Sequence, residues 1–438
     1  MKAEPVNKPA RHYASPRWSG ELLDCSMPLT FDTYDRCSYN CLYCFSYFQK
    51  SHSLKGGCNY VHNGKGSESI SHVNVKNVKR LFNLDPSLPK SYRQFFNYIR
   101  SSTTFQWGGL ADQFDNNERE HGITRLLLHE FKKLKYPICF STKATWWLSD
   151  DRYTKIFEGT DNWNCKFSII NLDKSRSAKM ELGCPSPEAR LKAIGRYSKL
   201  CKGGATLRLR PFIIGFSDKD NEHLELIKLA KEYGATAVST EFFCLEARAN
   251  ANLKARYYKM SEIVGFDIFE FYRRNSKGSG YRRLTRVAKK KYIDEMDALC
   301  SKLGLRFYVS DAHFKERSCN GSCCGLSDDW NYYRGQFTEA LVIAKERGSV
   351  RYSDISGSVR HVFQGVPFVN AEGFNTNSSI VRAMRYKQTM ADYVRSIWNK
   401  PNSLKSPYKY FGGVLKPSGT DDNNDIIYVY DDKWDMKR

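Results

Sequence analysis

Three cysteines stand close together in the stretch RCSYNCLYCFS, residues 36–46 of this 438-residue chain. Cys37, Cys41 and Cys44 follow the spacing C-x3-C-x2-C, and no histidine or carboxylate lies among them. Zinc sites usually come as two separated ligand pairs, whereas three thiolates can hold a cube of four irons and leave one iron open for another ligand. The triplet therefore predicts a 4Fe-4S cluster, with a surface zinc knuckle as the alternative.

The same stretch resembles the radical S-adenosylmethionine (SAM) superfamily, in which an aromatic residue, here Tyr43, stands just before the last cysteine. The resemblance implies that SAM binds the open iron and that an electron from the cluster cleaves SAM to methionine and a 5′-deoxyadenosyl radical. It also implies a protein reductant such as flavodoxin or ferredoxin. Tyr43 is therefore expected beside the cofactor.

The family places its cluster loop after the first strand of a partial (β/α) barrel, and this chain has the matching order of elements. Residues 27–35 are a plausible strand before the loop. Further strands are predicted at 103–107, 136–142, 165–170, 206–214, 236–243 and 305–310, with amphipathic helices at 123–134, 186–200 and 221–234. We expect an α/β fold, a partial barrel of about six parallel strands, with its sites at the carboxyl ends of the strands.

Around this barrel the sequence predicts three regions. They are an N-terminal arm at residues 1–24, a barrel at 25–312 with an inserted loop at about 46–100, and a mostly helical, cysteine-containing region at 313–438 that covers the substrate. No run approaches the roughly 18 apolar residues of a membrane span, and the start lacks the apolar segment of a signal peptide. We expect a cytoplasmic protein with no membrane partner.

Polar groups follow the predicted strands where a cofactor would bind. Gly108 and Gly109 come after the second strand, and glycines let backbone approach a ligand closely; in the family a glycine pair here holds the SAM amino group. Lys143 follows the third strand and is expected to pair with the SAM carboxylate. Ser168, in the fourth strand, is expected to bond the ribose.

Arg208 and Arg210 complete the predicted cofactor-binding set, because they alternate with apolar neighbours and so point to one face of their strand. Residues 211–218 after them resemble the family's adenine-side segment. Each group also has a plainer interpretation: the glycines form a turn, the lysine is solvated and the arginines are surface charge. Their order on successive strands favours the cofactor site. No residue is assigned to the hydrogen abstraction itself.

A narrower resemblance, to the branch that contains spore photoproduct lyase, rests on GGLADQFDNNEREHGITRLLLHEF, YPICFSTK and CPSPEARLKAI and covers roughly residues 29–218. It implies radical chemistry on a pyrimidine in DNA. Members that repair the thymine dimer use a cysteine near the second strand as hydrogen donor, but residues 105–115 contain none. This absence argues against dimer repair and leaves other pyrimidine chemistry open.

The charge of the chain indicates a polyanionic partner. Lys and Arg number 69 against 47 Asp and Glu, a formal net charge of +22, and nucleic acid is the commonest cytoplasmic polyanion. The stretch 281–292 carries six positive charges and no negative one. Read as a helix, it puts Arg282, Arg286 and Lys289 on one face as phosphate contacts, with a solvated face as the alternative.

A second group of thiols, Cys319, Cys323 and Cys324, lies in SCNGSCCG. We predict a second iron-sulfur cluster here, with Cys58, Cys244, Cys300 or substrate as the fourth ligand. Two alternatives remain open: one of these thiols donates a hydrogen atom to a substrate radical, or all three are buried packing residues.

The sequence thus predicts a radical SAM enzyme that acts on a modified thymine base in DNA, with isomerisation by radical migration favoured. Phage enzymes that remodel hypermodified thymine are the nearest analogy and would place the chain in a host cytoplasm. A radical SAM maturase acting on a peptide through an auxiliary cluster is one alternative. A non-catalytic, zinc-containing nucleic-acid-binding protein is the other.

Overall fold

The computed structural model describes residues 16–18, 23–46, 70, 72–277, 281–327, 329–356 and 390–432. The chain divides into two compact units, which are considered separately. Unit 1 contains Phe31–Lys79 and Gln106–Phe307, and unit 2 contains Arg17–Thr30, Arg80–Phe105 and Tyr308–Arg438. Most of the predicted N-terminal arm and of the loop after the cysteine triplet, including Cys58, lies outside the described residues.

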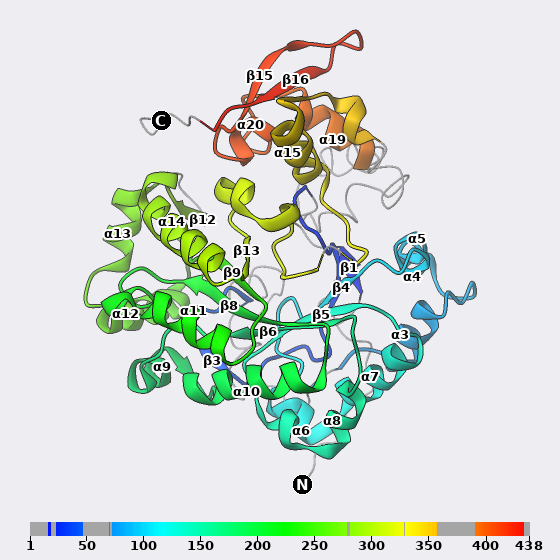
Figure 1. Ribbon diagram of the computed structural model, residues 1–438, viewed down its shortest axis with the longest axis vertical. Helices are drawn as coiled ribbons and strands as arrows, with labels where there is room; N and C mark the ends of the chain where they lie inside the picture. The colour runs from blue at the N-terminus through cyan, green and yellow to red at the C-terminus, as the bar shows by residue number, and fades with distance from the viewer. Residues whose placement is uncertain are drawn as a thin grey trace. The chain divides into compact units, whose positions relative to one another are not determined.

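The predicted α/β fold with a central parallel sheet is confirmed (Figure 1). The strands follow the order β2 (Leu29–Phe31), β4 (Phe105–Trp107), β5 (Ile138–Thr142), β6 (Trp163–Ser168), β8 (Ala205–Phe212), β9 (Ala237–Phe242) and β13 (Arg306–Val309). Parallel pairing joins β5 to β6, β6 to β8 and β8 to β9. Strand β6 is buried along its whole length, as expected for a parallel sheet covered on both faces.

Helices surround this sheet in unit 1 and have local sequence reasons for their ends. They are α6 (Asn116–His121), α7 (Ile123–Lys133), α8 (Asp151–Phe157), α9 (Lys174–Met180), α10 (Pro187–Leu200), α11 (Glu222–Glu232), α12 (Ala251–Val264), α13 (Ile268–Asn275) and α14 (Arg286–Lys302). Ser186 caps α10 by accepting from the Ala189 amide, and Pro187 takes the first helical position, where its missing N–H costs nothing. The three amphipathic helices predicted from the sequence are confirmed as α7, α10 and α11.

Aromatic rings fill the space between the sheet and helices α8 and α10. Trp147 stacks on Phe114 with ring centroids 4.5 Å apart and also contacts Phe157 at 4.7 Å. Phe140 from β5 and Tyr197 from α10 close the cluster at 6.3 Å. The cluster thus packs against β5 through Phe140, and Lys143 directly follows the end of that strand.

Unit 2 combines helices with a small sheet. Among its described residues are α4 (Lys90–Arg93), α5 (Phe96–Arg100), α15 (Gln336–Arg347), α19 (Met390–Trp398) and α20 (Pro407–Tyr410). Strands β14 (Ser349–Val350), β16 (Ile426–Tyr430) and β15 (Leu415–Thr420) form an antiparallel sheet. Trp398 is buried against Tyr428, 4.9 Å between ring centroids. The described part of residues 313–438 thus combines helices with a three-stranded sheet.

Two further features bear on the sequence predictions. The described part of the segment expected as an inserted loop contains helices, α3 (Val75–Phe82) besides α4 and α5. Within the described ranges, no helix is long and apolar enough to cross a membrane.

Candidate cluster and cofactor site

The cysteine triplet lies on a loop that is fixed at its centre by strand pairing. Strand β3 (Asn40–Cys41) pairs antiparallel with β7 (Glu181–Leu182), so Cys41 stands opposite Glu181. The Cys44 amide donates to the Cys41 carbonyl at 3.1 Å, which closes a tight turn between the two cysteines. Among the described residues, no group of three or more His, Cys, Asp or Glu side chains is arranged to hold a metal ion.

The electrostatic surroundings of Cys41 suit a thiolate ligand. The Cys184 sulfur lies 3.6 Å from the Cys41 sulfur. This hydrogen bond lowers the pKa of Cys41, and the nearby Lys143 ammonium adds to the effect. Burial raises the pKa of Cys37, with the carboxylates of Asp115 and Asp112 adding to the rise. Because metals bind the thiolate, Cys41 is better prepared than Cys37, and the all-sulfur donor set fits an iron-sulfur cluster.

Arg256, from α12, holds the backbone of the loop. Its guanidinium donates to the Leu42 carbonyl at 3.2 Å, to Asn40 Oδ1 at 2.7 Å and to the Cys41 carbonyl. Three acceptors on consecutive residues are satisfied by one planar group, so the turn has little freedom to rearrange. Nothing in the local sequence of the loop predicts this contact, because Arg256 is more than 200 positions away.

Two buried carboxylates support the loop from the other side. Asp115 accepts from the Ser38 amide at 2.5 Å and caps α6 through the Asn117 amide at 3.0 Å. Asp112 accepts from Thr142 Oγ1 at 2.8 Å and from the Lys143 amide at 2.6 Å. Burial raises the pKa of both carboxyls, that of Asp115 to about 7. The pair therefore ties the cysteine loop, the segment after β4 and the end of β5 into one structure.

Lys143 is half-buried beside an ion pair that also reaches the cysteine loop. Its Nζ lies 5.6 Å from the centre of the Tyr43 ring. Burial by itself would lower the pKa of Lys143, but Cys41, Glu181 and Cys184 outweigh it and raise the pKa above its ordinary value. Lys143 therefore stays a cation at neutral pH. A half-buried ammonium at the end of a sheet strand is suited to bind a carboxylate.

Glu181 and Arg190 form that ion pair, and both side chains are 0% exposed. The guanidinium lies 2.5 Å from Glu181 Oε2 and also donates to the Ser168 carbonyl at 2.6 Å. The Tyr43 hydroxyl donates to the second oxygen of Glu181. Burial would raise the pKa of Glu181, but Arg190 and Lys143 outweigh it and lower the pKa instead. The pair thus connects Tyr43 in the cluster loop to the end of β6.

The loop after β4 requires glycine at its first position. Gly108 has φ +78°, and a β-carbon there would lie 1.0 Å from Gln113 Nε2. Its amide donates to the Phe31 carbonyl at 2.8 Å. The next amides, of Leu110 and Ala111, both donate to Asp32 Oδ1 at 2.8 Å. Gly108 is therefore part of a fixed turn at the end of β4, and its neighbour Gly109 lies within the same turn.

The remaining predicted cofactor residues lie at the ends of β6 and β8. Ser168 is buried and receives a hydrogen bond of 3.3 Å from Arg208. Arg210 forms an ion pair with Glu241. The structure therefore brings Ser168 and Arg208 together, while Arg210 has a carboxylate partner in the next strand. Their roles toward SAM stay predictions.

The predicted phosphate-contact face at residues 281–292 is wrong. Tyr281–Leu284 forms strand β12, and the helix α14 begins only at Arg286, with Thr285 as its cap. Lys289 is 0% exposed and Arg286 is 8% exposed. A strand followed by a capped helix does not put Arg282, Arg286 and Lys289 on one helical face, and two of the three point into the protein.

The second thiol group lies in unit 2 around a short helical turn, Cys319–Gly321. The sulfurs of Cys323 and Cys324 are 3.4 Å apart. The ammonium of buried Lys315 lies 3.2 Å from the Asp24 carboxylate. Asp24, Cys323 and Cys324 raise the pKa of Lys315, although burial by itself would lower it. A second cluster at Cys319, Cys323 and Cys324 stays a prediction.

Comparison with known proteins found distant structural likenesses. No family model and no curated protein matches the chain. A spore photoproduct lyase complexed with dinucleoside spore photoproduct is 14% identical, with TM-score 0.46, over 68% of this chain and 80% of the other. A variant of that enzyme with bound AdoMet and the same photoproduct is 13% identical, with TM-score 0.46, over 66% and 79%. SuiB of Streptococcus suis, bound to precursor peptide SuiA, is 14% identical, with TM-score 0.39, over 67% and 52%.

Proposed function

We propose that this protein is a radical SAM enzyme that acts on nucleic acid. The proposal rests on the chain's own residues. The observation that carries it is the position of Lys143, a half-buried cation beside Cys41 and over the ring of Tyr43. A thiolate-rich loop can hold an iron-sulfur cluster, and a cation beside it can bind the carboxylate of SAM.

In this proposal Cys37, Cys41 and Cys44 supply three thiolates to a 4Fe-4S cluster. When SAM is bound to it, the cluster supplies the electron that produces a 5′-deoxyadenosyl radical. Lys143 neutralises the carboxylate of SAM, and its position is held by Asp112 through the Lys143 amide. The turn at Gly108 and Gly109 provides backbone groups for the SAM amino group, and Ser168 with Arg208 provides polar groups for the ribose.

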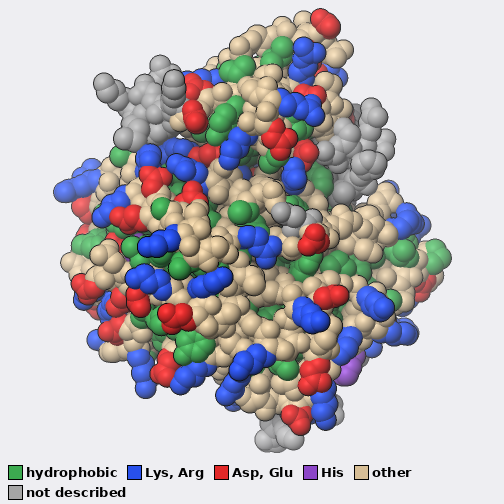
Figure 2. All heavy atoms as spheres, in the orientation of Figure 1, with side chains coloured by type: hydrophobic (Ala, Val, Ile, Leu, Met, Phe, Trp, Pro, Cys, Tyr) green, Lys and Arg blue, Asp and Glu red, His purple; other side chains and the backbone are tan. Residues whose placement is uncertain are grey.

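The substrate is proposed to be a modified thymine base in DNA, which undergoes rearrangement by radical migration. The formal net charge of +22 supports a polyanionic substrate. Figure 2 shows lysine and arginine side chains spread over the visible face and interspersed with acidic ones. The residues that contact phosphate are therefore better sought in a local cluster than in a uniform basic face.

Anaerobic reconstitution with iron and sulfide, followed by incubation with SAM and DNA, tests the proposal. We expect a brown protein that forms 5′-deoxyadenosine, and a mass change in one nucleoside of the digested DNA. Lys143→Met should raise the SAM concentration needed for half-maximal cleavage by at least about tenfold, since it removes a charge-assisted contact worth roughly 1.5–3 kcal/mol. The matched control Lys228→Met, on the exposed side of α11, should leave SAM cleavage unchanged. A protein that binds zinc and stays colourless would contradict the proposal, and a product found only with peptide would refute the nucleic-acid part.

A further inference from the structure

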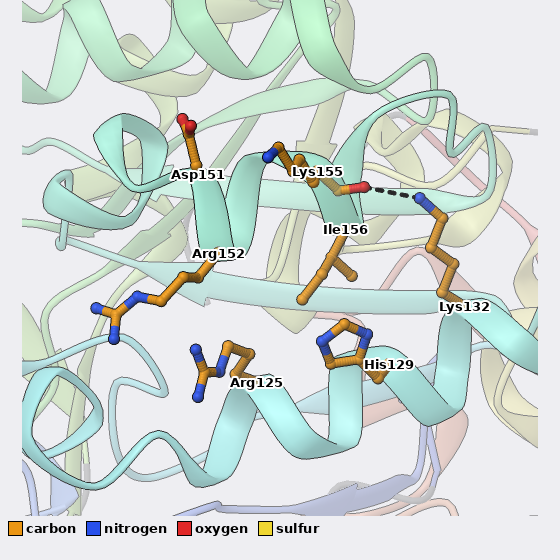
Figure 3. A pocket seen from close by; sticks show the side chains of 7 residues that line it. All are labelled: Arg125, His129, Lys132, Asp151, Arg152, Lys155 and Ile156. Atoms are coloured by element: carbon orange, nitrogen blue, oxygen red, sulfur yellow. Dashed lines mark hydrogen bonds between the residues drawn. The ribbon is translucent and has the colours of Figure 1, made fainter.

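A hollow of about 500 Å³ lies on unit 1 between α7 and α8 (Figure 3). Its lining includes Arg125, His129 and Lys132 from α7, and Asp151, Arg152 and Lys155 from α8. Four of these side chains are permanent cations and one is a carboxylate. The hollow is therefore a local concentration of positive charge, which residues 281–292 do not provide.

Much of this positive charge is not neutralised by neighbours. Arg152 is paired with Asp150, 2.6 Å away. In the described part of the chain, neither Arg125 nor Lys155 has a carboxylate within 4.0 Å. Burial lowers the pKa of His129, and the positive charges of Arg125, Lys79 and Lys132 lower it further, which is itself a sign of positive potential in the hollow.

Two of the cations are held in place by the fold. Lys132 Nζ donates to the carbonyls of Lys155 and Glu158, at 2.9 and 3.2 Å, and so joins the end of α7 to the end of α8. The guanidinium of Arg125 lies 6.0 Å from the centre of the Tyr153 ring. In Figure 3 the side chains of Arg125 and Arg152 extend toward the same side of the hollow. The arrangement leaves planar N–H groups available to an anion.

The hollow begins at the edge of the sheet where the proposed cofactor site lies. Helix α7 runs into β5 through a short connection, so its carboxyl end is near the start of that strand and its amino end is near the strand's carboxyl end. The same holds for α8 and β6. Arg125 and Arg152 stand in the first turns of their helices and are thus nearest to Lys143. Lys132 lies about 10 Å further along α7, which matches roughly three nucleotides of a DNA strand.

We propose that this hollow binds the sugar–phosphate backbone of the nucleic acid whose base is modified at the barrel mouth. The inference rests on the proposed function, because it takes nucleic acid as the substrate. Arginine side chains match phosphate in a fork geometry, and lysines add charge without reading sequence. The seven lining residues include four permanent cations, and Ile156 is the one apolar side chain among them. The contact is therefore with phosphate and independent of base sequence.

The test compares two double variants that remove the same charge. Arg125→Ser with Lys155→Ser removes two cations that have no carboxylate partner. Lys192→Ser with Lys228→Ser removes two exposed cations on α10 and α11. Binding of a fluorescein-labelled, thymine-rich DNA of about 20 nucleotides, single-stranded and duplex, is measured by anisotropy at several salt concentrations. The charge-conserving variant Arg125→Lys with Lys155→Arg is included, and thermal unfolding verifies that every variant is folded.

The variant Arg125→Ser with Lys155→Ser, here called the hollow variant, should bind DNA with an affinity lower by roughly tenfold. The slope of log K against log salt should become shallower by about 1–2. The control variant should change affinity less than about twofold, and the charge-conserving variant should retain most of the binding. Equal losses in both double variants, or no loss in the hollow variant, would overturn the inference. The inference would also be overturned if the hollow variant lost its binding to poly-glutamate but kept its binding to DNA, because the partner would then be an acidic protein. Formation of 5′-deoxyadenosine without DNA should be unaffected, so a failure of the radical SAM proposal is detected separately.

Discussion

Replacement of Glu181 with glutamine is expected to destabilise unit 1 strongly. The change leaves the size of the side chain nearly unaltered but removes the negative charge that Arg190 faces. Arg190 would then be a buried cation, 0% exposed, that faces only neutral acceptors: the amide oxygen of the new glutamine, the Ser168 carbonyl and the Ser177 hydroxyl. Its Nε already lacks a partner within the described structure. Among the described residues, Glu181 is the one carboxylate that forms an ion pair with Arg190.

Removing one partner of a buried ion pair typically costs about 3–5 kcal/mol, because an uncompensated charge remains. For a chain of this size each kcal/mol lowers the melting temperature by roughly 2 °C, so a fall of roughly 6–10 °C is expected. The Tyr43 hydroxyl would also face an amide in place of a carboxylate, and the cluster loop should become less ordered. Lower iron incorporation at a given temperature should accompany the loss of stability.

Thermal unfolding followed by circular dichroism measures the effect, with two further variants as controls. Glu188→Gln, in an exposed pair with Lys192, should leave the melting temperature unchanged. The double change of Glu181→Leu with Arg190→Met removes both charges and should be less destabilising than Glu181→Gln alone. The pKa of Glu181 is lowered in the folded chain, so its contribution is present above its unfolded pKa and is lost as pH falls through the lower folded value. An unchanged melting temperature in Glu181→Gln would refute the reasoning.

Three further predictions concern the loops of the site. Gly108→Ala should weaken SAM binding and lower the free energy of unfolding by at least about 1–2 kcal/mol, because the position has positive φ and the new β-carbon meets Gln113. Isothermal titration measures SAM binding, and unfolding in urea measures the free energy of unfolding. Arg256→Met should reduce iron incorporation without removing any cysteine, whereas Arg273→Met, on the exposed face of α13, should not; unchanged iron in Arg256→Met would contradict the role assigned to it. If Cys319, Cys323 and Cys324 hold a second cluster, Cys323→Ala with Cys324→Ala should lower the iron count by about four per chain, and a constant count would leave these residues as packing thiols or hydrogen donors.

The sheet was predictable from sequence because its strands are buried runs of apolar residues separated by helices with clear amphipathic patterns. All six strands predicted after the cysteine loop are present, with ends that differ by a few residues. Ser186 followed by Pro187 is typical of a helix start, and α10 begins there. Such signals depend on neighbours in the sequence and do not require tertiary contacts.

The error at residues 281–292 also has a local origin. A basic stretch was read as one continuous helix, but Thr285 accepts from the Ala288 amide and so begins the helix there. Residues before the cap pair as a strand with β10 (Leu245–Glu246) and β11 (Ser276–Lys277). A threonine followed by a helical pattern was the available sign. The burial of Lys289 could not be read from composition, since lysine is usually exposed.

The supporting residues of the site escaped sequence analysis because they come from distant positions. Cys184 contacts Cys41 across 143 residues, and Arg256 reaches the same loop from α12. Asp112 and Asp115 stand in ADQFD, directly after the two glycines, and two acidic residues so close to a predicted ligand turn were a usable sign. Glu181 and Arg190 had no such sign in the sequence, because two residues that form a buried ion pair look like two surface charges until the fold brings them together.

The central claim is that Cys41 is a ligand of an iron-sulfur cluster that cleaves SAM. The most direct measurement is the iron content and the 5′-deoxyadenosine yield of Cys41→Ala beside Cys184→Ala, both reconstituted anaerobically. The two thiols are 3.6 Å apart, but only Cys41 belongs to the triplet. We predict that Cys41→Ala loses about four irons per chain and all SAM cleavage, while Cys184→Ala keeps both. SAM cleavage at the wild-type rate by Cys41→Ala, or equal loss of iron in the two variants, would contradict the account.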